Sequence, residues 1–121
     1  MAENITLKIF TPERTALNRK VYRVVLPYGN TNLTIVEDRA PTSLVLHDGA
    51  MHILNADDSI ADTYFLDDGV VDVADNVCKI STRHIIHRSK ISLERARQLL
   101  EEEPQNESYY QAIINYLENF D

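Results

Sequence analysis

Residues 85–96 read IIHRSKISLERA, and they contain the point at which the hydrophobic pattern of the chain changes. Before Lys90 the apolar residues come in short, partly alternating runs, and after it they recur at three- and four-residue spacing. Alternation is typical of a half-buried β-strand, whereas the longer spacing is typical of an amphipathic helix. The change therefore predicts a β-domain at residues 1–87 and a helical segment at residues 91–121.

Upstream of this change, a series of apolar runs predicts strands. In the first run, Ile5, Leu7 and Ile9 alternate with polar residues. The other runs lie at residues 21–26, 33–36, 43–46, 51–54, 63–66, 70–73 and 77–80. Turn-forming residues separate them, including the glycines Gly29, Gly49 and Gly69. Short strands at roughly 8–12-residue spacing predict an antiparallel β-sandwich, so the fold class is mainly β with α.

Downstream of the change, the pattern predicts two helices. Ser92 can cap the first helix, and Pro104 should end it near Glu103. Asn106 can cap the second helix. The expected apolar faces consist of Leu93, Ala96, Leu99 and Leu100, and of Tyr109, Ile113, Tyr116, Leu117 and Phe120. Two such helices with a short link predict an antiparallel helical hairpin, and splayed helices are the alternative.

The composition is that of an acidic globular chain. Its 121 residues include 12 Lys and Arg against 19 Asp and Glu, for a formal net charge of -7. This charge disfavours nucleic acid as a partner, because the phosphates would be repelled. No apolar run approaches the roughly 20 residues that span a bilayer, and no secretory signal peptide opens the chain. The single cysteine, Cys78, cannot form an internal disulfide, so we expect a reducing compartment.

Residues with a chemical role are sparse. The isolated glycines form no phosphate-binding loop. His84 and His87 would lie on opposite faces of a strand, which favours surface or interface roles over a metal site. The aspartates at 57–58 and 67–68 lie at strand ends, which favours turns over calcium binding. Cys78 lies in an apolar run and is expected in the core. We therefore expect no catalytic residue, no metal and no cofactor.

Several phrases, in order, resemble the epsilon subunit of bacterial rotary ATP synthases, which is called delta in mitochondria. Residues 8–13 (KIFTPE) are similar to the family's opening strand and its Thr-Pro-Glu turn. Further similar phrases lie at residues 24–27 (VVLP), 40–44 (APTSL), 65–73 (FLDDGVVDV) and 91–96 (ISLERA). The resemblance covers nearly the whole chain, and it implies a β-sandwich followed by a two-helix hairpin.

The resemblance also implies a function. It indicates a non-catalytic central-stalk rotor subunit that couples proton translocation to ATP synthesis or hydrolysis. Its partners would be the gamma subunit and the membrane c-ring. It would lie on the cytoplasmic side of the inner membrane, as a peripheral part of the complex, and its C-terminal helices would regulate ATP hydrolysis. An unrelated β-sandwich protein-interaction module is the alternative interpretation.

The loop that faces the ring in this family departs from the family pattern here. Thr31 and Thr34 stand where glycines are usual, Asp38 replaces a further glycine, and Arg39 replaces a histidine. Because glycine gives easy access to positive φ, we expect the loop to take a different path. The resemblance implies ring or partner contacts at Thr31, Asn32, Arg39, Ala40 and Pro41.

A nucleotide site is the last feature that the resemblance implies. In some members an Ile-Asp-x-x-Arg-Ala segment binds ATP, and Ile91, Ser92 and Arg95 occupy the first, second and fifth positions of that segment. Ser92 can still cap the helix, but it lacks the carboxylate that could grip a ligand. We therefore expect a structural cap and weak or absent ATP binding.

Overall fold

The structure is a computed structural model that describes residues 3–28 and 31–120. The first sheet contains β1 (Ile5–Phe10), β2 (Thr15–Val21), β5 (Thr42–Leu46), β8 (Gly69–Ala74) and β9 (Val77–Ser81). The second contains β3 (Arg23–Tyr28), β4 (Thr31–Ile35), β6 (Gly49–Leu54), β7 (Ile60–Leu66) and β10 (Ile85–His87). A 3₁₀ turn η1 (Arg88–Lys90) precedes α1 (Leu93–Glu102), and a second, η2 (Pro104–Asn106), precedes α2 (Glu107–Phe120).

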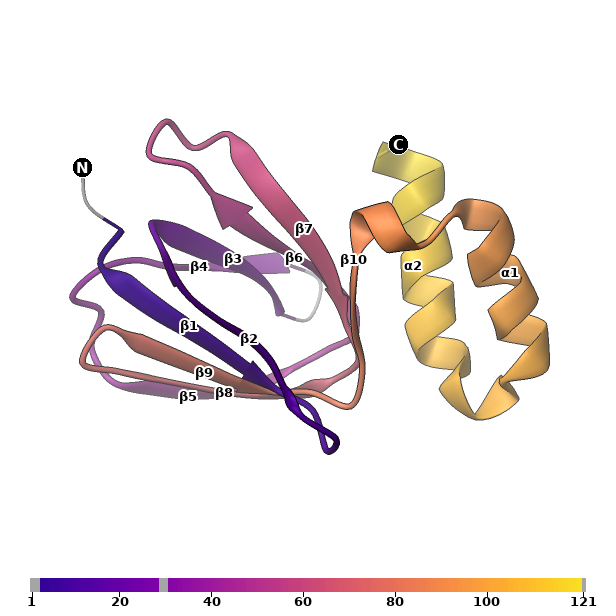
Figure 1. Ribbon diagram of the computed structural model, residues 1–121, viewed down its shortest axis with the longest axis horizontal. Coiled ribbons are helices and arrows are strands. Elements are labelled where there is room, and N and C mark those ends of the chain that lie inside the picture. Colours follow the sequence, from indigo (N-terminus) through magenta and orange to yellow (C-terminus); the bar gives the residue numbers. More distant parts are fainter. Residues whose placement is uncertain (1–2, 29–30, 121) are drawn as a thin grey trace.

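The two sheets form a sandwich, and the two helices stand against one end of it (Figure 1). The strand orders are β2-β1-β9-β8-β5 and β10-β7-β6-β3-β4. Alternation along β1 places Ile5, Leu7 and Ile9 inside, each at most 2% exposed. Cys78 is also fully buried, as expected, and burial raises the pKa of its thiol to about 12. The predicted fold class, a β-sandwich followed by a helical hairpin, is confirmed.

The strand pattern differs from the prediction in two places. The run at residues 21–26 is not one strand, because Val21 ends β2 and Arg23 begins β3. β2 itself was not expected, since most of its residues are polar and it lies at the edge of its sheet. The sandwich also contains a parallel pair, β1 with β9, whereas the other pairs of described strands are antiparallel.

Gly49 and Gly69 each open a strand, and the expected turn at Gly29 lies outside the described residues. Gly69 opens β8 with a φ of +150°, a conformation that side chains rarely adopt. A Cβ at this position would lie 2.1 Å from the carbonyl oxygen of Ser81. Gly49 opens β6, where a Cβ would meet Cβ of Pro27 at 2.8 Å. Close approach to a neighbouring strand therefore accounts for glycine at both positions.

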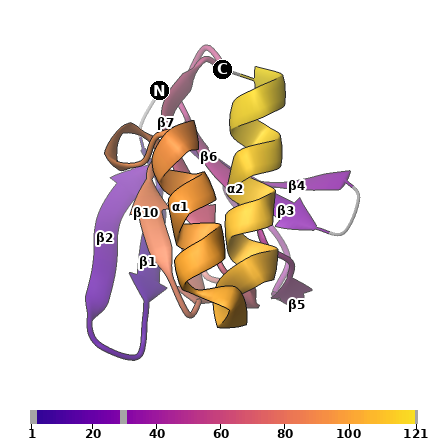
Figure 2. The same cartoon turned by 90° about the vertical axis from the view of Figure 1, so that its right-hand side faces the viewer.

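The helices form an antiparallel hairpin, with α1 and α2 side by side in Figure 2, so the splayed alternative is wrong. Arg97 Nη2 bonds Glu118 Oε2 across the hairpin at 2.9 Å. The first helix ends before Pro104, as predicted. The predicted cap at Asn106 is wrong, because Asn106 belongs to η2 and its Nδ2 donates to Glu103 Oε1 at 3.0 Å. Phe120, which was expected on the apolar face, is 70% exposed.

Candidate functional site

The expected ring contacts lie along β4 and in the segment that follows it. Thr31 and Asn32 are exposed at the start of β4, which is an edge strand of its sheet. Ala40 and Pro41 are exposed beyond the other end of the strand, and Arg39 is half-buried beside them. The structure thus places these five residues in two groups, one toward each end of β4.

Hydrogen bonds hold the loop after β4 in place. The backbone N–H of Asp38 donates to Asn76 Oδ1 at 2.7 Å, and Asn76 Nδ2 donates to Asp38 Oδ1 at 3.1 Å. Asn4 Nδ2 donates to Glu37 Oε1 at 2.8 Å. Asp38 has a φ of +61°, in the left-handed region that short polar residues tolerate. Aspartate can therefore adopt the conformation for which glycine is usual, so the reason for expecting a different loop path does not hold at residue 38.

The residues of the implied nucleotide site lie where the sandwich leads into α1. Ser92 Oγ accepts a hydrogen bond from the backbone N–H of Arg95 at 3.0 Å, which confirms the predicted cap. The Arg95 guanidinium lies along its own helix, with Nη1 3.2 Å from Gln98 Oε1 and 3.6 Å from Glu102 Oε2. Ile91 is 7% exposed and packs in the apolar cluster beneath the helices. These contacts give all three residues a structural role, and weak or absent ATP binding stays a prediction.

The hairpin contacts the sandwich through a junction that is both apolar and polar. Phe65 of β7 is 1% exposed and lies in one cluster with Tyr109, Ile113 and Leu117 of α2. The Tyr109 hydroxyl donates to the carbonyl oxygen of Phe65 at 3.1 Å, and burial raises its pKa. The Tyr109 ring also stacks on His84, with ring centroids 5.6 Å apart. The start of α2 is therefore fixed to the sandwich by directed contacts as well as by burial.

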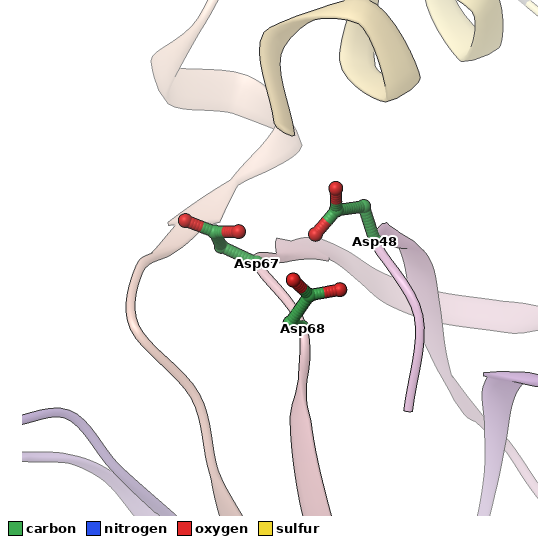
Figure 3. Close-up of side chains that lie close together, drawn as sticks. All are labelled: Asp48, Asp67 and Asp68. Atoms are coloured by element: carbon green, nitrogen blue, oxygen red, sulfur yellow. The ribbon is translucent and has the colours of Figure 1, made fainter. Parts of the chain in front are cut away.

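Three aspartates gather beside this junction (Figure 3). Asp48 lies between β5 and β6, and Asp67 and Asp68 lie between β7 and β8. One carboxylate oxygen from each residue lies within 4.8 Å of one oxygen from each of the others, and among the described residues these three aspartates are the group with suitable spacing for a cation. Both oxygens of Asp67 already accept bonds, from Arg83 Nη2 at 2.9 Å and from His84 Nδ1 at 2.6 Å. The cluster therefore serves as a network of hydrogen bonds and charges.

The turn interpretation of the aspartates is correct for some of them and wrong for Asp67. Asp58 and Asp68 have positive φ values of 66° and 48°, and Asp57 Oδ1 accepts from the backbone N–H of Ser59 at 3.0 Å. The Asp67 side chain is instead fully buried and forms an ion pair with the guanidinium of Arg83. Its partners, Arg83 and His84, are 16 and 17 positions away in the chain, so the local sequence shows only a residue close to a glycine turn.

His84 and His87 lie partly exposed at the surface and bond carboxylates of the sandwich. His84 bonds Asp67, whereas His87 Nε2 lies 2.9 Å from Oδ1 of Asp62. The two rings thus contact different aspartates. Sequence reasoning missed the contact of Asp48 Oδ2 with the Ser108 hydroxyl, which joins residues 60 positions apart. No local pattern marks such a pair.

Comparison with known proteins places this architecture in context. Residues 4–88 match the family model described as ATP synthase, Delta/Epsilon chain, beta-sandwich domain. The ATP synthase epsilon chain of Gluconacetobacter diazotrophicus is 28% identical over 98 residues, which cover 81% of this chain and 69% of that relative.

Two solved structures contain a chain with the same fold. One is the Euglena gracilis mitochondrial ATP synthase, OSCP/F1/c-ring in rotational state 1, with a TM-score of 0.70 and 18% identity over 96% of this chain and 77% of that chain. The other is the Tetrahymena thermophila mitochondrial ATP synthase central stalk/c-ring, with a TM-score of 0.59 and 16% identity over 90% of this chain and 96% of that chain.

The family match decides between the two interpretations of the sequence. It spans well over half of the chain and includes the ten strands found in the described residues, so an unrelated interaction module is excluded. Within the described residues, neither helix combines the length and the apolar character needed to cross a membrane. The chain belongs to the ATP synthase delta/epsilon chain family.

Proposed function

We propose that this chain is a non-catalytic central-stalk subunit of a rotary ATP synthase that couples proton translocation to ATP synthesis and hydrolysis. The match of residues 4–88 to the delta/epsilon sandwich domain carries this proposal. The related epsilon chain supports it, and so do the two similar chains in solved structures, because both structures are of ATP synthase assemblies that contain a c-ring and one is of the central stalk.

The partners in this proposal are the gamma subunit and the membrane c-ring. The sandwich docks on gamma, and the β4 edge with its following loop meets the ring through Thr31, Asn32, Arg39, Ala40 and Pro41. The bonds of Asp38 to Asn76 hold this loop in a set shape, which lowers the entropy cost of docking. The chain is then a peripheral component on the cytoplasmic side of the inner membrane.

The hairpin is the regulatory part in this proposal. Its helices bury their apolar faces in a cluster separate from the sandwich core, and Phe65 is the fully buried sandwich residue in that cluster. A hairpin attached in this way can leave its docked position without opening the sandwich. We propose that such movement changes the rate of ATP hydrolysis by the assembled enzyme.

Copurification tests the partners. The tagged full chain, produced together with gamma and the c-ring from the same source, should retain both through a gradient. Arg39→Glu should weaken retention of the ring, because it reverses charge within the proposed contact. Lys20→Glu is the matched control, since Lys20 is exposed on β2 at the edge of the other sheet. A wild-type chain that retains neither partner would overturn the function, and equal retention by both variants would remove the loop from the interface.

A further inference from the structure

Asp48 connects a turn of the sandwich to the first turn of α2. Its Oδ2 accepts a hydrogen bond from the hydroxyl of Ser108, and the next residue, Tyr109, donates to the carbonyl oxygen of Phe65 at 3.1 Å. Adjacent residues of α2 therefore hold two separate points of the sandwich. Loss of either bond would loosen the same end of the helix.

The second oxygen of Asp48 is in an unfavourable place for an ionised carboxylate. Oδ1 is buried and has no hydrogen-bond partner among the described residues. Figure 3 shows the carboxylate with one oxygen toward the helices and the other toward Asp67 and Asp68. Negative charges this close disfavour one another, and a buried acceptor without a donor costs free energy. A proton on Asp48 would remove one charge and supply a donor between Asp48 and Asp67.

Asp67 is the carboxylate that stays ionised. Burial acts to raise its pKa, but hydrogen bonds from His84 and Arg83 outweigh burial and hold the pKa below its usual value. Asp67, Arg83 and His84 all belong to the sandwich, so this pairing does not depend on the hairpin. Asp48 has no bond to a basic side chain among the described residues. Burial raises the pKa of Asp48 to about 6, because burial together with Asp67 and Asp68 outweighs the hydrogen bond from Ser108, which favours the ionised form.

The remaining charged and titratable groups around Asp48 are exposed or stay neutral. His47 precedes it on the same turn, Asp68 comes from the turn after β7, and Glu107 opens α2, and all three are exposed. The hydroxyl of Tyr109 keeps its proton, because burial raises its pKa. Asp48 is therefore the carboxyl group at this junction that burial and its acidic neighbours favour in the protonated form.

We propose that Asp48 and Ser108 form a proton-dependent clasp, in which a proton on Asp48 strengthens the docking of the hairpin on the sandwich. This inference goes beyond the proposed function and holds for the chain alone. In the docked form the pKa of Asp48 is about 6; undocking hydrates the carboxyl group and lowers this pKa, although Asp67 and Asp68 of the sandwich stay beside it and keep it above 3.8. A raised pKa favours docking at low pH, so docking is strongest below the undocked pKa and weakens as pH rises through 6.

Two measurements on the full chain test the clasp. Carbon-13 NMR of the aspartate carboxyl groups should show Asp48 titrating near pH 6, and a midpoint near 4 would overturn the proposal. Amide exchange of α2, corrected for the intrinsic rate, should become slower from pH 7.5 to pH 5, by at most about tenfold. Amides of β9 serve as the internal reference for unfolding of the sandwich. Equal protection of α2 at both pH values would also overturn the proposal.

Substitutions separate the clasp from general charge effects. Asp48→Asn resembles the protonated acid, so α2 should show at pH 7.5 the protection that the wild type shows at pH 5, with no further pH response. Ser108→Ala should lower protection at both pH values. Asp68→Asn keeps the Asp48–Ser108 bond and suits a φ of +48°, but it removes a charge that helps to raise the pKa of Asp48, so it should move the pH response of α2 to lower pH without abolishing it. A pH response retained in full by Asp48→Asn would exclude Asp48 as the proton site.

Discussion

The interior of the sandwich and its junction with the helices are built in different ways. The sandwich core joins apolar side chains from both sheets, including Leu7, Leu26 and Ile80, all fully buried. The junction combines an aromatic cluster around Phe65 with the hydrogen bonds of Ser108 and Tyr109. The core is complete without the helices, whereas the helices need the sandwich to cover their apolar faces. The first region therefore sets the fold, and the second controls where the hairpin lies.

A substitution in the sandwich should have the largest effect. Gly69→Ala places a Cβ 2.1 Å from the carbonyl oxygen of Ser81 at a φ of +150°. Strain and clash together should lower the free energy of unfolding by about 3 kcal/mol, measured by urea denaturation. Gly49→Ala is the control: its Cβ would meet a side-chain carbon of Pro27 at 2.8 Å, without a positive φ. A loss at Gly69 no greater than that at Gly49 would contradict the backbone argument.

Removal of the hairpin should have a smaller effect on the sandwich. A chain that ends at Arg88 should still unfold in one cooperative transition, because its core contains no helical residue. Exposure of Phe65 should cost about 2 kcal/mol relative to the full chain. Circular dichroism during urea denaturation measures both quantities. A shortened chain without a cooperative transition would show that the boundary between sandwich and hairpin is not a domain boundary.

Addition of ATP should have the smallest effect. The Arg95 guanidinium lies beside Glu102 and Gln98, and Ser92 uses its hydroxyl as a helix cap. We expect isothermal titration of the full chain with ATP to give no saturable heat. Arg95→Ala is the control for any signal. Micromolar binding that disappears in this variant would show that the segment holds nucleotide as well as capping α1.

Much of the fold could be predicted because its signals are local. The alternation of Ile5, Leu7 and Ile9 marks a strand with one buried face, and Pro104 marks the end of a helix. β2 escaped prediction because Asn18, Arg19 and Lys20 lie within it and only Val21 is fully buried. An edge strand needs little apolar surface, so its sequence resembles a loop.

The candidate site was less accessible to prediction, since its contacts join distant parts of the chain. Asp48 and Ser108 are 60 positions apart, and neither belongs to a motif. Asp67 lies beside Asp68 and Gly69 and looked like a turn residue, although its burial beside Arg83 gives it a different role. The cap at Ser92 was predictable because a cap depends on residues within one helical turn.

The parallel pairing of β1 with β9 has a consequence for how the chain is made. β1 lies between β2 and β9 in its sheet. β2 is synthesised directly after β1, whereas β9 is the last strand of that sheet to be synthesised. Until Ser81 has left the ribosome, the first sheet cannot close and β1 keeps an open edge. Assembly that depends on such distant partners is slow, typically in milliseconds to seconds, whereas helices form within about a microsecond. The helices follow β9 closely in the sequence. They are therefore synthesised at about the time when the sandwich that they cover can first form.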